Sequence, residues 1–134
     1  MSLETWKAEF YPEEAHDASE RGDSAAVEHS MRKWVGLSPA NLEKHGMVTS
    51  EIGSNIFEQK DREKVFHAHA GTCALCELYV RNKCKDCPLT KARGVSCDDE
   101  RDDEEVSPWH EWAHMQNPEP MVYWLNLAKE HCDD

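Results

Sequence analysis

Five cysteines clustered in residues 73–97 are the part of this 134-residue chain best suited to chemistry. Their spacing is C-x2-C-x7-C-x2-C-x9-C, and each C-x2-C pair can present two sulfur atoms to one ion. Structural zinc takes four such ligands in a tetrahedron. Clustered cysteines in a reducing compartment favour metal binding over disulfides. The sequence therefore predicts a zinc site in this segment.

The two cysteine pairs differ in their surroundings, and this difference guides the choice of ligands. The stretch CKDCP has polar residues inside the pair and a proline after it, which suits a tight turn around a metal. The stretch CALCELY is typical of a helix, where its two cysteines would share one face at i and i+3. Cys73 is then a spare thiol or an alternative ligand. The four predicted ligands are Cys76, Cys84, Cys87 and Cys97.

A zinc ion held by four thiolates has no open position for water, so such a site stabilises structure and does not catalyse. Its net negative charge can be offset by basic side chains of the same segment. These are Arg81, Lys83, Lys85, Lys91 and Arg93. His67 and His69 are weaker candidate ligands. Two other uses of the thiols stay open, a redox dithiol and a four-thiolate iron–sulfur cluster.

A second motif with chemical potential is HEWAH, which fits H-E-x-x-H and would place His110, Glu111 and His114 in a minimal zinc hydrolase. Its surroundings argue against that use. A serine–proline pair starts the predicted helix just before the motif, and an asparagine–proline pair ends it just after. Glu130 and His131 are candidate third ligands in the last helix. We predict that the chain is not an enzyme, with the zinc hydrolase as the alternative.

Acidic residues are concentrated near the C-terminus of a chain with a formal net charge of −12. Residues 98–134 hold 12 acids and 2 bases, whereas residues 1–97 hold 15 acids and 13 bases. Such a surface repels nucleic acid and anionic lipid and attracts basic partners. Acids steer association and tryptophans anchor interfaces. The predicted partner-binding residues are Asp98, Asp99, Glu100, Asp102, Asp103, Glu104, Glu105, Trp109 and Trp112.

Helical periodicity and helix-capping signals dominate the chain, and no stretch shows a convincing strand alternation. We expect a single, mainly α domain over residues 1–134. Its parts are helices in 1–80, the cysteine-rich zinc segment 73–97, an acidic loop 98–106 and C-terminal helices in 107–132. The longest helix is expected over about 55–80. Because no apolar run is long enough for a membrane span and the N-terminus lacks a signal pattern, we expect a cytoplasmic protein.

The cysteine block CALCELY…CKDCPL…C and four flanking stretches form a pattern over most of the chain. The flanks are WKAEFYP, HSMRKWVGL, SPWHEW and NPEPMVYWL. The pattern resembles a group of small proteins encoded by bacteriophages and prophages, and its most specific element is Cys-x2-Cys-Pro-Leu. The resemblance implies a mobile-element origin and zinc ligation by Cys84 and Cys87 with Cys76 and Cys97.

By type alone, a small acidic protein of this origin is similar to anti-CRISPR inhibitors and other counter-defence factors. Many of these act by binding basic machinery that handles nucleic acid. The resemblance implies a non-enzymatic inhibitor in the cytoplasm of a bacterial host cell. Its partner would be a basic host protein, with a nucleic-acid-guided nuclease such as a Cas nuclease as the leading candidate. The overall charge disfavours direct binding of nucleic acid by the basic residues of the cysteine segment.

Overall fold

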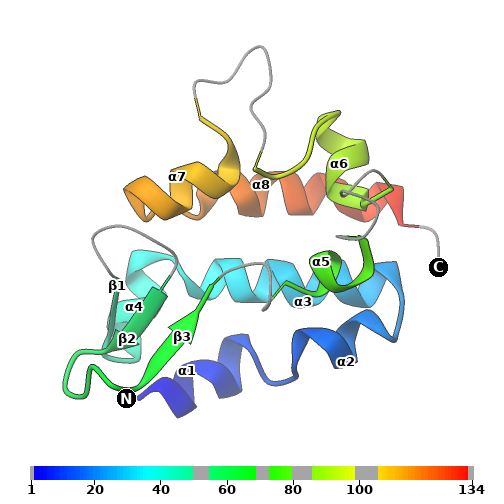
Figure 1. Ribbon diagram of the computed structural model, residues 1–134. Coiled ribbons are helices and arrows are strands. Elements are labelled where there is room, and N and C mark those ends of the chain that lie inside the picture. The colour runs from blue at the N-terminus through cyan, green and yellow to red at the C-terminus, as the bar shows by residue number, and fades with distance from the viewer. Residues whose placement is uncertain (1, 50–54, 69–72, 80–85, 99–105, 133–134) are drawn as a thin grey trace.

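Helices make up most of the structure, as the sequence predicts, and one small sheet joins them (Figure 1). The computed structural model describes residues 2–49, 55–68, 73–79, 86–98 and 106–132. The described elements in chain order are α1 (Leu3–Phe10), α2 (Ala15–Ser19), α3 (Asp23–Gly36), α4 (Pro39–Lys44), β1 (Met47–Thr49), β2 (Asn55–Glu58), β3 (Val65–His67), α5 (Ala74–Tyr79), α6 (Pro88–Arg93), α7 (Pro108–Met115), α8 (Glu119–Ala128) and the 3₁₀ turn η3 (Lys129–His131).

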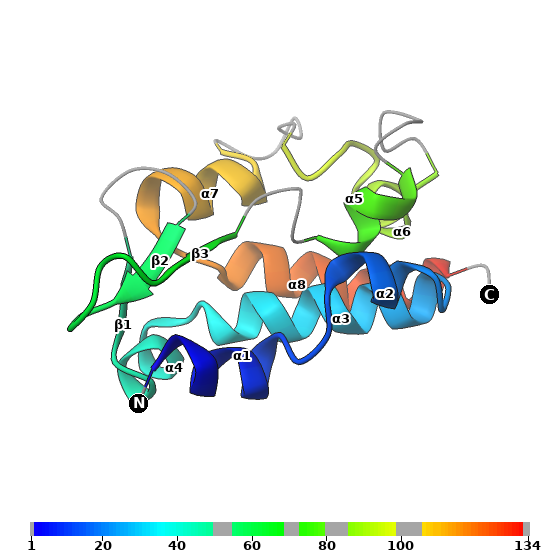
Figure 2. The same cartoon turned by 60° about the horizontal axis from the view of Figure 1, so that its bottom comes forward.

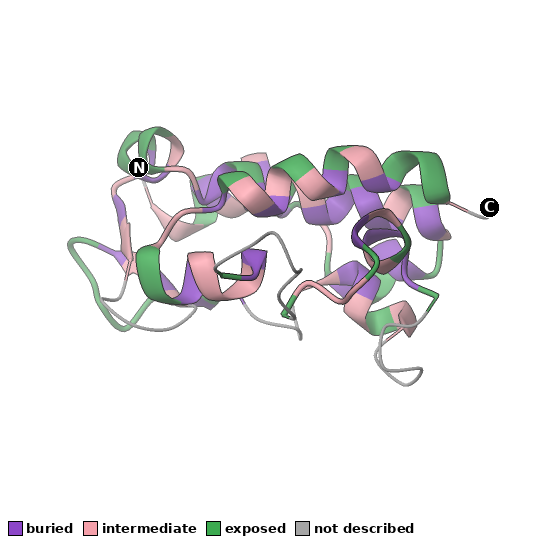
Figure 3. Cartoon of the chain, turned by 90° about the horizontal axis from the view of Figure 1, so that it is seen from above, coloured by how far each residue is buried: buried purple, intermediate pink, exposed green. Residues whose placement is uncertain are grey.

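The helix α3 runs through the middle of the molecule, and other helices pack on several of its sides. In Figures 1 and 2, α1 and α2 lie along one side of α3 and α8 lies along another. The contacts of α5 with α2 and α3 bring the cysteine segment to the same central helix. Buried residues alternate with exposed ones along the helices, as Figure 3 shows from above. Residues of α3 are therefore well placed to meet side chains from distant parts of the sequence.

The helix α1 is fixed to the end of α3 by a close approach at Gly36. The Trp6 side chain is fully buried, and its Nε1 donates to the Gly36 carbonyl oxygen at 2.8 Å. A Cβ atom added at Gly36 would lie 2.4 Å from Phe10 Cγ, well inside van der Waals contact. Ser2 and Thr5 form a capping box at the start of α1. The missing side chain at Gly36 thus allows the two helices to meet.

The predicted helix over 55–80 is wrong, because its first part forms strands. The strands β1, β2 and β3 pair antiparallel in that order, with Val48 opposite Phe57 and Ile56 opposite Phe66. Ile56 is fully buried, and the Phe66 ring lies 4.9 Å from the Trp6 ring, between centroids. Short runs of β-branched and aromatic residues on both sides of a charged turn favour a hairpin. Within the described part of residues 55–80, only α5 (Ala74–Tyr79) is helical.

Helix starts marked by serine and proline are confirmed in two places. Ser38 precedes Pro39 at the first position of α4, and Ser107 precedes Pro108 at the first position of α7. The Ser107 side chain accepts a hydrogen bond from the His110 backbone N–H at 3.2 Å. A proline at this position loses no helical hydrogen bond, so the pair is a strong local start signal. This start fixes where the HEWAH residues lie on α7.

Candidate functional site

A fully buried lysine, Lys33 of α3, lies among the thiols of the cysteine segment. Its residue is 0% exposed, and its Nζ lies 4.8 Å from the centre of the Trp34 ring. Burial lowers the pKa of Lys33, whereas the nearby Cys73, Cys76 and Cys97 act in the opposite direction because their thiolates favour the ammonium form. A buried charge is strongly unfavourable unless an opposite charge compensates it. Burial has the larger effect, so the pKa of Lys33 is lowered overall.

Cys73 lies just before α5, and its surroundings favour the thiolate form. Its carbonyl oxygen accepts from the Glu77 N–H at 3.1 Å, and its Sγ lies 3.7 Å from the Ser30 Oγ of α3. A hydrogen bond with the Cys76 side chain lowers the pKa of Cys73 well below its usual value. Burial opposes this effect, and the charge of Lys33 and the Ser30 hydroxyl add to it. A thiolate is the form of cysteine that binds metal.

The chain before Cys97 is held by hydrogen bonds on both sides. The Trp109 N–H donates to the Cys97 carbonyl oxygen at 3.0 Å, and the Arg93 guanidinium donates to the Ser96 carbonyl oxygen. Gly94 ends α6 with a φ of +86°, a conformation that favours glycine. These contacts hold the backbone at Ser96 and Cys97. Arg93 thus contributes a backbone contact next to a cysteine, which the sequence did not indicate.

Cys87 directly precedes Pro88 at the start of α6 and is buried. Its carbonyl oxygen accepts from the Lys91 N–H at 2.9 Å. Cys84 lies outside the described residues, as do Arg81, Lys83, Lys85 and His69. In the described ranges no three His, Cys, Asp or Glu side chains already have the spacing of a metal site. Of the predicted ligands, Cys76 and Cys97 interact electrostatically with Lys33, as does the alternative ligand Cys73.

Sequence reasoning missed Lys33 and Ser30, which belong to a helix about forty residues before the cysteine segment. The two residues lie at i and i+3 and share a face of α3. Ser30 is 0% exposed, and the same helix also buries Val27 and Trp34. The signal available in the sequence was a polar pair inside an otherwise apolar helical stripe. A buried polar stripe of this kind indicates a partner on another element, although it does not identify that partner.

The HEWAH side chains lie on α7, and their hydrogen bonds connect them to neighbouring residues of the chain. His110 Nδ1 lies 2.7 Å from Ser107 Oγ, and the rings of His110 and His114 stack with 5.8 Å between centroids. The Glu111 carboxylate accepts from Asn117 Nδ2 at 3.2 Å. Within the part of the chain that the structure describes, no third donor joins the two histidines. A catalytic zinc needs three protein ligands and an open position.

The predicted partner-binding tryptophans require a correction. Trp112 is 0% exposed, because its ring packs edge-on against Trp34 at 5.7 Å between centroids. It is part of the core between α3 and α7 and cannot anchor a partner. Trp109 is half-buried and also contacts the Trp34 ring edge-on, at 6.2 Å. Asp98 is exposed, and the other predicted acids, in 99–105, lie outside the described residues.

Comparison of the chain with known protein families, with curated proteins and with solved structures gives no match. Among the helices described, none combines the length and the apolar character needed to cross a bilayer. The geometry and charge of the chain itself therefore guide the inference of its function.

Proposed function

We propose that this protein is a non-enzymatic, metal-stabilised inhibitor that binds a basic nucleic-acid-handling protein in a bacterial cytoplasm. The proposal is supported by the fully buried Lys33, which interacts electrostatically with Cys73, Cys76 and Cys97, and by the Ser30 hydroxyl 3.7 Å from Cys73 Sγ. Thiolates beside a buried side chain suit a closed structural ion, which leaves no position for a substrate. A closed centre of this kind supports a function in binding.

Zinc is the ion that we propose, with Cys73, Cys76 and Cys97 as three of its ligands and Cys84 or Cys87 as the fourth. The donor set supports this choice, since four sulfur ligands are typical of structural zinc. The ion would join α5 and the chain around Cys97 to one point beside α3. An iron–sulfur cluster would use the same number of thiolates and is distinguished by the iron and sulfide content of the purified protein.

The acidic C-terminal third supports the binding part of the proposal. Residues 98–134 carry 12 acids against 2 bases, and Asp98 and Glu119 are exposed. Tyr123 of α8 is 60% exposed and lies at an apolar hollow of about 350 Å³ between α3 and α8. Aromatic side chains beside acidic ones are common anchors at interfaces. Tyr123 thus takes the role that the sequence assigned to Trp112.

The chemistry of the surface favours a basic partner. Proteins that handle nucleic acid carry lysines and arginines for the phosphate backbone, and an acidic protein can occupy the same surface. A nucleic-acid-guided nuclease is the first candidate, as the resemblance to phage proteins implies. Association guided by such charges is fast at low ionic strength and weakens as salt is added.

The test is binding to a purified guided nuclease at low and high salt, together with inhibition of its cleavage. One variant replaces the seven acids of residues 98–105 by their amides, and a matched control replaces seven exposed acids of residues 1–97. We expect salt-sensitive binding and inhibition that the first variant loses and the control retains. Binding that ignores salt, or two variants that bind equally, contradicts the docking of this acidic segment.

A further inference from the structure

The strand β1 forms one edge of the sheet, because the strand order is β1-β2-β3. Just before β1, the Gly46 carbonyl oxygen accepts from the Gln59 N–H at 2.9 Å, so the backbone of Gly46 faces the β2 side. Antiparallel strands exchange ladder bonds at alternate residues. The backbone groups of Val48 therefore also face β2. Those of Met47 and Thr49 point away from β2, toward the open side of the sheet.

This open edge has few of the features that protect edge strands. Among the residues that the structure describes, none bonds to the outward N–H and C=O groups of Met47 and Thr49. Exposed edges are usually protected by charged residues or proline. The opposite edge, β3, directly follows residues 60–64, all of which are charged. The sequence of β1 is Met-Val-Thr, so apart from its short length it has no such protection.

An apolar hollow of about 370 Å³ borders the edge and is lined by residues of β1, of α4 and of the end of α7. The strand β1 and the helix α4 contact each other (Figure 1). Leu37, Pro39 and Leu42 supply apolar lining on the α4 side. Alternate side chains of a strand point to the same face, so a strand beside β1 can direct apolar side chains to the hollow. An open edge next to such a hollow is typical of sites that bind an extended peptide.

The charge of the site selects among extended partners. Of the residues described at the hollow, Glu43 of α4 is the charged one, and it is exposed. No basic side chain pairs with Glu43 in the described part of the chain. A peptide with lysine or arginine beside its apolar residues complements this carboxylate. A second copy of the chain would instead bring another Glu43 and a net charge of −12, which repel.

We propose that β1 binds an extended, basic segment of another protein, which adds to the sheet as one more strand. Met47 and Thr49 supply the backbone hydrogen bonds, and the hollow takes an apolar side chain. Glu43 pairs with a neighbouring lysine or arginine of the segment. This site goes beyond the proposed function, because it requires neither the metal centre nor the acids of residues 98–105. Failure of the site would leave both of these in place.

The first experiment measures binding of a dye-labelled peptide of alternating lysine and valine to the wild-type protein by fluorescence anisotropy. Two further peptides carry N-methyl groups, one on every valine and the other on every lysine. A strand turns only alternate N–H groups toward its neighbour, so one methylated peptide should bind at least about tenfold more weakly than the other. The two have the same charge, so attraction to an acidic surface alone cannot separate them. A peptide with glutamate in place of lysine should not bind.

The second experiment changes the protein at the edge. Thr49→Pro removes an N–H that faces away from β2, so it loses no ladder bond, and edge strands tolerate proline. The matched control, Thr49→Val, keeps that N–H. We expect Thr49→Pro to bind the lysine–valine peptide at least about fivefold more weakly than Thr49→Val. Glu43→Gln should weaken binding about two- to fivefold and reduce its dependence on salt. Circular dichroism checks that each variant is folded.

Three results overturn the inference. The first is equal binding of the two methylated peptides, or no binding of the lysine–valine peptide, and it decides the question even if Thr49→Pro does not fold. The second is glutamate peptide that binds as tightly as the lysine peptide, which removes the selection by Glu43. The third is a wild-type dimer in sedimentation that Thr49→Pro converts to a monomer, which would assign the edge to a second copy of the chain.

Discussion

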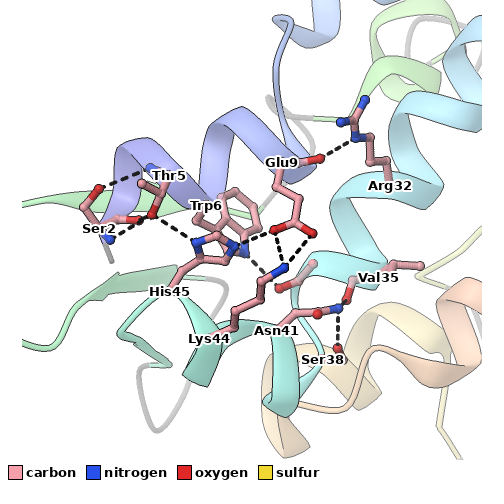
Figure 4. Close-up of polar contacts among 11 residues, drawn as sticks. Ser2, Thr5, Trp6, Glu9, Arg32, Val35, Ser38, Asn41, Lys44 and His45 are labelled. Atoms are coloured by element: carbon pink, nitrogen blue, oxygen red, sulfur yellow. Dashed lines mark hydrogen bonds and ion pairs between the residues drawn. The ribbon is translucent and has the colours of Figure 1, made fainter.

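Two regions of the molecule bring a cation close to groups that can carry negative charge. One is the cysteine–lysine centre, formed by Lys33, Cys73, Cys76 and Cys97, and the other is the polar network between α1 and α4. In the network of Figure 4, the Glu9 carboxylate accepts from Lys44 Nζ at 3.0 and 3.2 Å and lies 2.7 Å from His45 Nε2. Its anion is a carboxylate, which is ionised at neutral pH without help. The groups around Lys33 are cysteines, which bind metal as thiolates.

Solvent exposure separates the two regions further. The side chains of Lys44 and Glu9 are 59% and 39% exposed, and exposed ion pairs contribute little to stability. Lys33, in contrast, is completely enclosed. The N-terminal network is complete without an ion and contributes little, whereas we propose that the cysteine–lysine centre is strong only with an ion. We therefore expect perturbations of the centre to depend on metal and perturbations of the network to be independent of it.

Metal removal is the perturbation with the largest expected effect. Structural zinc can supply on the order of 10 kcal/mol to the folding of a small module. We expect a chelator, or the substitution Cys76→Ser, to cause a large drop in the unfolding temperature. The control Cys132→Ser, at the end of the chain beyond η3, should change it little. An unfolding temperature that the chelator does not change would contradict the claim that the cysteine–lysine centre depends on metal.

Gly36→Ala has the next largest expected effect, on the N-terminal side of the comparison. The new methyl group would collide with the Phe10 ring, with a cost of about 1–3 kcal/mol as α1 shifts. The matched control is Gly94→Ala, where no atom lies within 4 Å and only the positive φ opposes the change, at about 1 kcal/mol. Urea unfolding at saturating zinc measures both. A larger loss of stability in Gly94→Ala than in Gly36→Ala would contradict the close packing at Gly36.

Glu9→Gln is expected to have a small effect that depends on pH. Lys44 and then His45 hold the pKa of Glu9 below its usual value. The folded pKa is below the unfolded one, so this contribution is present above the unfolded pKa and is lost as pH falls through the folded pKa. Wild type should therefore exceed Glu9→Gln slightly in stability at neutral pH, and the two should converge in acid. A stability difference between the two proteins that grows as the pH falls would contradict the lowered pKa of Glu9.

The smallest expected effect concerns the HEWAH motif. Glu111→Gln keeps the size of the side chain that meets Asn117, so the loss in stability should be below about 1 kcal/mol. We expect peptide hydrolysis to be absent from the wild type and unchanged in the variant, at saturating zinc. Hydrolysis that Glu111→Gln abolishes would instead support a catalytic zinc on α7, beside the structural one.

Local signals in the sequence predicted the parts of the fold that local physics decides. The starts of α4 and α7 follow from a serine before a proline, because the proline suits the first helical position and Ser107 also caps α7. The strands β2 and β3 escaped prediction because each is only three or four residues long and gains its stability from pairing with a neighbour.

The candidate site was predicted in part, for a similar reason. Cysteine spacing within one segment indicated Cys76 and Cys97, which the structure brings to Lys33 together with Cys73. The counter-charge was sought among basic residues of that same segment. The packing of α5 on α3 also brings Lys33 near Cys73, a tertiary contact that the spacing of the cysteines could not indicate. Trp112 failed as a predicted surface residue because its helix face packs against α3.

The most direct test of the cysteine–lysine centre is elemental analysis of reduced, purified protein, with Cys97→Ser in parallel. We expect close to one zinc ion per wild-type chain. The Cys97→Ser protein should lose that ion and much of its thermal stability. Wild-type protein that contains no bound metal and unfolds at the same temperature as Cys97→Ser would contradict it.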